Sequence, residues 1–295
     1  MKRAYRIVNV FTRGGERLSG NPLCVFEDAH GLSDADMQAL ALQFNLSETS
    51  FILPPSANTT SPAAGANGAT PATARVRIFT PAMELPFAGH PTLGTAHVVR
   101  ALTGAGDKVT LELQAGLIPV TANADRWTLQ ANPPVTRAFD AARSAALAAA
   151  LGLDPHALAG VPLWVNAGME QLLVPLASKE AVRRASPGAG LAAFTSASAK
   201  VSVYCFSPLT EADMLVRFFF TKNTGSVAED PATGSACANL GGYALAVNAP
   251  LPLTRVLHQG EYVGRPSILT LDVDAVRTIR VCGEVIELGR GVLEL

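Results

Sequence analysis

Two stretches of this 295-residue sequence share one build, in which a strand leads through a turn of small residues into a helix. In the first, the apolar run 76–79 precedes Gly89-His90-Pro91, and a helix is expected from Pro91 to about Ala101. Pro91 suits the first helical position because its missing N–H costs nothing there. Gly89 and His90 then lie at unpaired backbone N–H groups and at the positive end of the helix dipole, which makes an anion site. A capped helix packed on a sheet is the alternative.

The second stretch, Asp230-Pro231-Ala232-Thr233-Gly234-Ser235, follows the aromatic strand 216–220 and leads into a helix expected to end at about Val247. Gly234-Ser235 can be aligned with Gly89-His90, and the two helix starts lie roughly half a chain apart. This pattern predicts a diverged internal duplication. Two similar domains would each aim a helix N-terminus at a shared cleft.

Composition narrows the function classes. Charged residues make up 16% of the chain and apolar residues 48%, and the formal net charge is −1. Such a chain can bury substantial cores, and without a basic run we expect no nucleic-acid partner. The four cysteines form no CxxC pair, as expected for reduced, mostly core residues. No apolar run is long enough to span a bilayer and the N-terminus lacks a signal core, so we expect a cytoplasmic protein with no membrane partner.

Strand patterns outnumber helix patterns and are joined by hairpin-length connections, which excludes a doubly wound βαβ protein. The expected fold class is α+β, with two similar domains, each a barrel-like, mostly antiparallel sheet around a central helix. The final strands of the chain are expected to cross back to the first domain. The predicted domains are therefore residues 1–124 plus about 280–295, and residues 125–279.

Local signals predict several further elements. Ser33 is expected to cap a helix that runs to about Phe44 and ends at Asn45, with acidic residues in its first turn. The segment 56–74 is expected to be a long exposed hairpin loop, partly disordered, because it is rich in Ala, Thr, Pro, Gly and Asn and carries no charge. A hairpin is expected over 109–120.

Neither a nucleotide cofactor nor a metal is expected. No Gly-x-Gly-x-x-Gly follows a strand, and no phosphate loop with Gly-Lys-Ser or Gly-Lys-Thr occurs. No histidine pair has the four-residue spacing of a zinc-binding helix, since His90 and His97 are seven residues apart. Ser235 does not lie in a Gly-x-Ser-x-Gly elbow.

Three polar residues are candidates for proton transfer: Glu48, His90 and Asp230. Each has a structural alternative, respectively a solvated turn residue, a helix cap and a charge that favours the helix dipole. Together they supply one carboxylate from each half of the chain and a histidine at a helix start. If the two halves close face to face, these groups converge.

Five motifs also occur in order along the chain. They are Asn21-Pro22, Leu46-Ser47-Glu48-Thr49, Arg77-Ile78-Phe79-Thr80-Pro81, Pro86-Phe87-Ala88-Gly89-His90-Pro91 and Asp230-Pro231-Ala232-Thr233-Gly234-Ser235-Ala236. In order and spacing, over nearly the whole chain, they resemble the PhzF-like isomerases of phenazine biosynthesis. The resemblance implies the diaminopimelate epimerase fold, with two related domains and an active site between them.

The resemblance also implies a role for each matching position. Glu48 matches the acid/base of the family, and His90 and Asp230 match its supporting polar groups. The positions that match its substrate-binding segments are Asn21, Gly89, Thr233, Gly234 and Ser235.

Two positions separate this chain from the epimerases and racemases of the same fold, which carry a cysteine at each helix start. The comparable places here hold Ala88 and Thr233, so two-base cysteine racemisation is disfavoured. The segment Cys237-Ala238-Asn239 departs from the PhzF-like pattern, which often has small residues including Gly there, and it alters the first turn of the second helix.

The leading prediction is a cofactor-independent isomerase that acts on a small carboxylate-bearing substrate. Glu48 would take a proton from one carbon and return it to another on the same face, which moves a double bond. The helix starts would hold the carboxylate and the charge that develops on it. The alternatives are an epimerase or racemase of a small amino or hydroxy acid, and a non-catalytic ligand-binding protein on the same fold. The resemblance is compatible with a homodimer.

Overall fold

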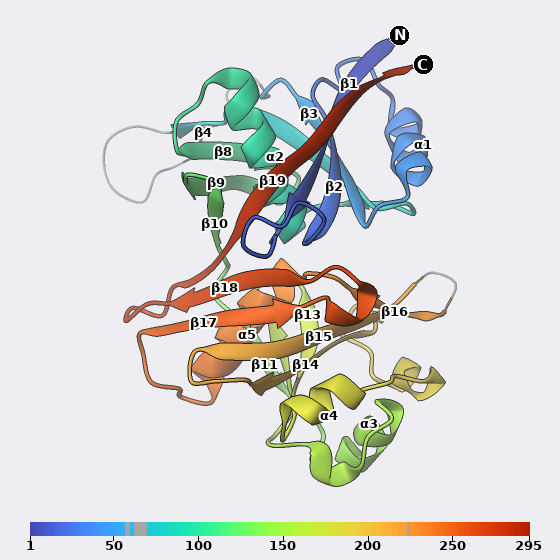
Figure 1. The fold of residues 1–295 in the computed structure, drawn as a ribbon, viewed down its shortest axis with the longest axis vertical. Helices are drawn as coiled ribbons and strands as arrows, with labels where there is room; N and C mark the ends of the chain where they lie inside the picture. Colours follow the sequence, from blue (N-terminus) through green and yellow to red (C-terminus); the bar gives the residue numbers. More distant parts are fainter. Residues whose placement is uncertain (57–59, 62–69, 223–224) are drawn as a thin grey trace. The chain divides into compact units, whose positions relative to one another are not determined.

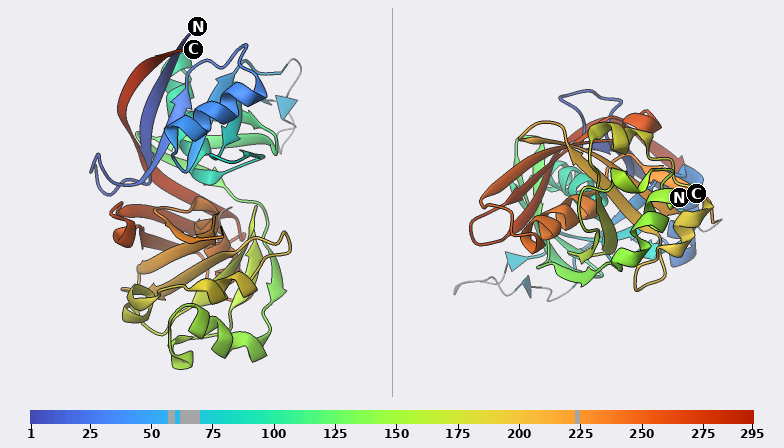
Figure 2. Two further views of the ribbon diagram at one scale, coloured as in Figure 1. Left: turned by 90° about the vertical axis from the view of Figure 1, so that its right-hand side faces the viewer. Right: turned by 90° about the horizontal axis from the view of Figure 1, so that it is seen from below.

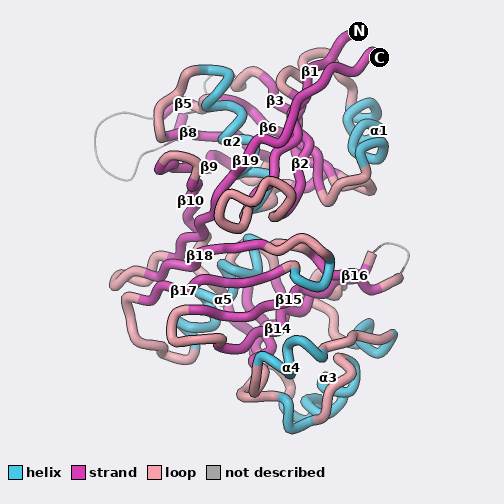
Figure 3. The backbone as a smooth tube through the Cα atoms, viewed as in Figure 1, coloured by secondary structure: helices cyan, strands magenta, loops and turns pink. Residues whose placement is uncertain are grey.

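A computed structural model describes residues 1–56, 60–61, 70–222 and 225–295. The chain divides into two units, residues 1–129 with 282–295, and residues 130–281. Strands dominate both units (Figure 3). Among the described residues, no helix combines the length and the apolar character needed to cross a membrane.

In the first unit, eight strands form a closed ring, because each pairs with the next and the last pairs with the first. Helix α2 (Gly89–Thr103) contacts β1, β2, β3, β6 and β8 of this ring and is therefore its central helix. Strand β19 runs antiparallel to β1 and brings the two ends of the chain side by side (Figure 1). In ring order the strands are β1 (Lys2–Val10), β2 (Asn21–Phe26), β3 (Glu48–Leu53), β6 (Ala74–Phe79), β8 (Lys108–Leu113), β9 (Gly116–Asn123), β10 (Arg126–Gln130) and β19 (Ile279–Glu294).

Close packing fixes α2 inside the ring. A Cβ atom on Gly94 would lie 2.7 Å from Cδ2 of Leu23 and 2.9 Å from Cγ2 of Val10. Only a residue without a side chain fits this approach, because carbon atoms do not pack closer than about 3.5 Å. The hydroxyls of Ser50 on β3 and Thr95 on α2 share a hydrogen bond of 2.6 Å. These contacts hold the start of α2 beside the starts of β2 and β3.

Helix α1 (Asp34–Phe44) lies against the outside of the ring, where it contacts β3 and β6 (Figure 2). The sequence predicts its ends correctly. The side chains of Ser33 and Asp36 form a reciprocal capping box, and Asn45 ends the helix in the left-handed conformation. The apolar face of α1 packs with Phe51 and Phe79 in one core cluster.

In the second unit, the strands pair in the order β11–β12–β13–β14–β15–β17–β18, and β16 pairs with the end of β15. Helix α5 (Gly234–Ala246) contacts β11, β12, β13 and β18, so the row of strands curls around it. The bounds are β11 (Val135–Ala138), β12 (Leu163–Asn166), β13 (Glu170–Pro175), β14 (Ser202–Pro208), β15 (Asp213–Thr221), β16 (Val227–Asp230), β17 (Leu253–Gln259) and β18 (Ser267–Val273).

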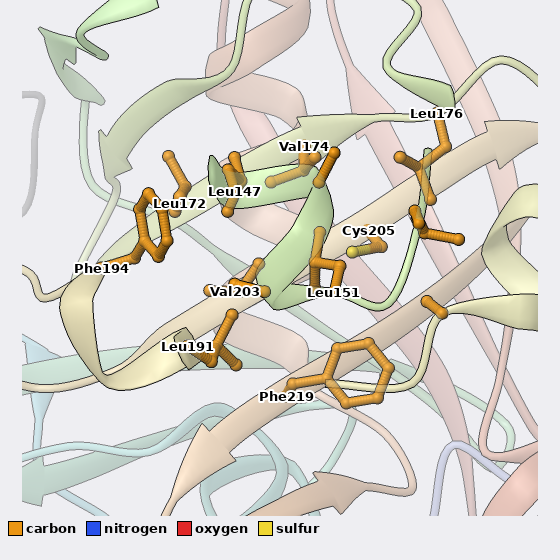
Figure 4. Packing of buried hydrophobic residues seen from close by; sticks show 14 of the residues in the cluster. Leu147, Leu151, Leu172, Val174, Leu176, Leu191, Phe194, Val203, Cys205 and Phe219 are labelled. Carbon is orange, nitrogen blue, oxygen red and sulfur yellow. The ribbon is translucent and has the colours of Figure 1, made fainter. Parts of the chain in front are cut away.

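The other face of this sheet carries a hydrophobic core cluster. Leu172, Val174, Val203, Cys205 and Phe219 project from the strands toward the small helices (Figure 4). Those helices are α3 (Ser144–Ala150), α4 (Lys179–Arg184) and the 3-10 turns Ala141–Arg143, Pro155–Ala157 and Ala189–Ala193, with Glu261–Val263 elsewhere in the unit.

The two units repeat one topology, as the duplicated motifs predict. In the first, β2 and β3 are parallel, β3 and β6 antiparallel, and β6 and β8 parallel across α2. In the second, β13 and β14 are parallel, β14 and β15 antiparallel, and β15 and β17 parallel across α5. A short strand, β7 (Glu84–Leu85) or β16, precedes each central helix. The predicted α+β fold class, with a sheet around a central helix in each half, is confirmed.

Helix α2 begins at Gly89 and not at Pro91, with Ala88 as the N-cap, so the expected start was wrong by two residues. Pro91 fits there because the first turn of a helix leaves its N–H groups without helical partners. The hairpin over 109–120 is confirmed by β8 and β9. The loop expected over 56–74 falls largely outside the described residues; within it, β4 (Thr60–Ser61) and β5 (Thr70–Pro71) pair.

Candidate active site

Two strand starts and one helix start form what we call the α2 cluster: Asn21, Glu48, Gly89 and His90. Asn21 opens β2 and Glu48 opens β3, and these strands run parallel with Leu23 opposite Glu48. Parallel neighbours begin at the same edge of a sheet. Gly89 and His90 are the first two residues of α2. The first unit thus brings together the residues that the sequence predicts for it.

The histidine and the carboxylate of this cluster are in contact. Nδ1 of His90 lies 3.5 Å from Oε2 of Glu48, and the two side chains are 6% and 17% exposed. Burial lowers the pKa of His90 to about 3, against the opposing effect of a backbone hydrogen bond at Pro22. The imidazole is therefore neutral at pH 7, and the contact joins a carboxyl group to a neutral ring.

The second ring nitrogen of His90 faces a different environment. Nε2 is buried and has no hydrogen-bond partner among the described residues. A neutral imidazole nitrogen donates or accepts a hydrogen bond according to its tautomer. This atom is therefore suited to bind a polar ligand group at the start of α2.

The corresponding α5 cluster of the second unit consists of Asp230, Thr233, Gly234 and Ser235. Asp230 ends β16, Thr233 is the N-cap of α5, and Gly234 and Ser235 are its first two residues. Gly234 thus holds the same helical position as Gly89. This equivalence is the one expected from the aligned motifs.

Neither central helix is capped by the side chain of its N-cap residue. Ala88 has no polar side chain, and the Thr233 hydroxyl donates to Oδ2 of Asp230 at 2.5 Å instead of accepting from the helix. Backbone N–H groups in an uncapped first turn attract anions, as does the dipole. Both helix starts therefore have the chemistry of a carboxylate-binding site.

Gln259 at the end of β17 organises the α5 cluster. Its side-chain amide donates to the Asp230 carbonyl at 2.9 Å and to the Thr233 hydroxyl at 3.0 Å, and accepts from the Thr233 backbone at 3.3 Å. Gly260 follows with a positive φ of 79°, and a Cβ atom there would lie 2.5 Å from the Pro231 carbonyl oxygen. The turn before α5 is thus packed directly on the end of β17.

Known proteins resemble this chain over almost its whole length. A family model described as phenazine biosynthesis-like protein matches residues 8–291. The chain belongs to this family. It is 40% identical over 293 residues to an uncharacterized isomerase of Pasteurella multocida, covering 98% of this chain and 93% of that one. It is 34% identical over 269 residues to the trans-2,3-dihydro-3-hydroxyanthranilate isomerase of Pseudomonas aeruginosa, covering 89% and 87%.

Solved structures agree on the fold. The phenazine biosynthesis protein of the PhzF family from Bacillus anthracis superposes with a TM-score of 0.83 at 23% identity, covering 100% of both chains. A hydroxyproline epimerase from Agrobacterium vitis gives 0.60 at 10% identity, covering 100% of this chain and 93% of that one. The epimerase-like fold is confirmed, and this PhzF-family chain is an isomerase like its named relatives.

Sequence reasoning missed several polar residues that support the two clusters. They are Ser50, Thr95, Gln171 and Gln259, while Asn239 was noted only as a departure from the family pattern. Gln171 had a signal, since it is a polar residue in an apolar strand. Whether the two helix starts serve one cleft stays a prediction of the sequence.

Proposed function

We propose that this PhzF-family isomerase moves a proton within a small carboxylate-bearing substrate, with Glu48 as the single acid/base. The carboxylate of Glu48 takes a proton from one carbon, and the electrons of that C–H bond form a new double bond. The protonated carboxyl then returns the proton to another carbon as the original double bond shifts. The proton that Glu48 takes is the proton that it returns, so the step needs no other reactant.

The observation that carries this proposal is the contact between Glu48 and the buried, neutral His90. A neutral ring forms no ion pair that would hold the Glu48 carboxylate away from a substrate proton. The start of α2 supplies backbone N–H groups for charge that develops in the transition state. General acid–base catalysis requires such a carboxyl group within hydrogen-bonding reach of the proton it moves.

The N-cap residues support a single-base mechanism over a racemisation with two cysteines. Ala88 and Thr233 hold these positions, and Cys237 is buried as the fourth residue of α5. We propose that the α5 cluster binds the substrate carboxylate through its helix N–H groups and Ser235. Asp230 and Thr233 hold the turn that presents them.

The relatives suggest a first substrate to test. Three of them are named trans-2,3-dihydro-3-hydroxyanthranilate isomerase, and anthranilates carry a ring carboxylate. Turnover of this compound in heavy water should place deuterium at a carbon of the product. Retained skeleton with a shifted double bond would identify an isomerase of the proposed kind, whereas inversion at one carbon would identify an epimerase.

Glu48→Gln tests the base directly, because it keeps the size of the side chain and removes its titrating proton. Deuterium incorporation should fall by about 10²- to 10⁴-fold, the usual contribution of general acid–base catalysis. Glu180→Gln, on the exposed surface of α4, is the matched control and should exchange like the wild type. Near-equal exchange by the Glu48 variant would refute the assignment.

A further inference from the structure

A chain of buried amides leads from the turn between β12 and β13 to the start of α5. Gln171 on β13 and Asn239 on α5 are both 0% exposed. Asn239 bonds to the segment before β13, Gln171 bonds to Asn239, and Ser235 bonds to Gln171. All of these residues belong to the second unit.

Two backbone groups fix the orientation of the Asn239 amide. The N–H of Ala167 donates to Oδ1 of Asn239 at 2.7 Å, and Nδ2 of Asn239 donates to the carbonyl of Met169 at 2.8 Å. A backbone N–H is always a donor and a backbone carbonyl always an acceptor. A flipped Asn239 amide would break both bonds, so its donor side is set by the fold.

The orientation of the Asn239 amide sets that of the Gln171 amide. Nδ2 of Asn239 also donates to Oε1 of Gln171 at 2.8 Å. The other end of the Gln171 amide, Nε2, therefore points to Ser235 and donates to its Oγ at 2.9 Å. Ser235 accepts in this bond, so its own O–H remains available to donate.

We infer that Gln171 and Asn239 are positioning residues that hold the Ser235 hydroxyl as a hydrogen-bond donor toward the ligand. The class of ligand group follows: a carboxylate oxygen, which accepts, and not an ammonium group, which donates. This inference rests on the proposed function, in which the α5 cluster binds a substrate carboxylate. Under this inference Asn239, where the chain departs from the family pattern, orients the Gln171 amide.

The test is a double-mutant cycle read as the equilibrium dissociation constant of anthranilate, measured by calorimetry without turnover. Gln171→Met removes the donor to Ser235 at similar volume, and Ser235→Ala removes the hydroxyl. Gln171→Met should weaken anthranilate binding about tenfold in the wild-type background, and less than about twofold in the Ser235→Ala background, because contacting residues of one network are coupled.

Gln171→Glu provides a second probe of the same bond. A carboxylate accepts from Asn239 but cannot donate to Ser235, so the hydroxyl should turn toward it and anthranilate binding should again weaken. If the added negative charge weakens anthranilate binding, the weakening should remain in the Ser235→Ala background. If the lost donor weakens binding, the weakening should disappear in that background. Gln38→Met is the matched control, since Gln38 donates to the Thr80 carbonyl in the first unit and should leave binding unchanged.

Equal losses in both backgrounds for Gln171→Met would overturn the inference, as would a wild type that does not bind anthranilate. The outcome is separable from that of the proposed function. If Gln171 and Ser235 are coupled but Glu48→Gln still incorporates deuterium like the wild type, only the assignment of Glu48 as the base is refuted. If the losses of anthranilate affinity are additive and Glu48→Gln no longer incorporates deuterium, only the positioning role of Gln171 and Asn239 is refuted.

Discussion

Nδ1 of His90 lies 3.5 Å from Oε2 of Glu48, at a point where a buried helix start meets the first residue of a strand. The contact is that of a carboxyl group with a neutral ring, because burial lowers the pKa of His90 to about 3. His90 therefore contributes polarity and shape to the α2 cluster without adding a positive charge at neutral pH.

The depressed pKa of His90 predicts a loss of stability in acid. Because the folded-state pKa of about 3 lies below the ordinary histidine value of 6.5, the unfolded chain binds the proton more readily. The stabilisation is complete above pH 6.5 and is lost as the pH falls from 6.5 toward 3, by up to about 1.4 kcal/mol per pH unit. Urea unfolding of the wild type and His90→Asn at pH 7 and pH 5 measures it. The variant should lose less stability than the wild type, whereas His156→Asn, at an exposed position, should behave like the wild type.

Gly260 should tolerate no side chain. A Cβ atom there would lie 2.1 Å from the Arg265 carbonyl oxygen and 2.5 Å from that of Pro231. Gly260→Ala should lower the free energy of unfolding by about 3 kcal/mol or more, because steric overlap adds to backbone strain. Gly264 has a similar φ of 67° but nothing within 4 Å of the same position, so Gly264→Ala should cost only about 1–2 kcal/mol. If denaturant unfolding shows equal losses of unfolding free energy for Gly260→Ala and Gly264→Ala, the close packing at Gly260 is contradicted.

Arg217 forms a buried network that Arg137 lacks. Its guanidinium binds Glu229 at 2.6 and 3.0 Å and donates to the Ala185 carbonyl at 2.7 Å beyond the end of α4. Arg217→Met should lower the free energy of unfolding by about 3–5 kcal/mol, because it leaves a buried carboxylate without its partner. Arg137 binds Glu170 at 3.1 Å, but its side chain is 49% exposed, so Arg137→Met should cost at most about 1 kcal/mol. Thermal unfolding of the two variants side by side decides between these outcomes.

The folded protein should be more stable with phenylalanine in place of Tyr204. Its hydroxyl is buried and has no hydrogen-bond partner among the described residues, and burial raises its pKa well above the ordinary value. Removing an unsatisfied buried hydroxyl in Tyr204→Phe should raise the free energy of unfolding by about 1 kcal/mol. Tyr243 donates to the Val161 carbonyl at 3.3 Å, so Tyr243→Phe should not be stabilised. A destabilised Tyr204→Phe protein would show that the hydroxyl has a structural role.

Local patterns were sufficient for much of the fold. Ser33, followed by acidic residues, marked the start of α1, and small residues after a strand marked both central helices. These signals act within a few residues of each other, so they are visible in the sequence. The repeated strand–turn–helix motif also predicted the two similar units and aligned Gly89 with Gly234.

The tertiary structure alone decided how the site residues are held. The bonds from Gln171 to Ser235 and from Gln259 to Thr233 join positions 64 and 26 residues apart. Such bonds depend on which strands become neighbours, and no local pattern states that. The neutral state of His90 likewise depends on burial within the ring of strands. The sequence by itself therefore determined which residues are candidates, while packing determined their partners and their charge, because both depend on groups that only folding brings together.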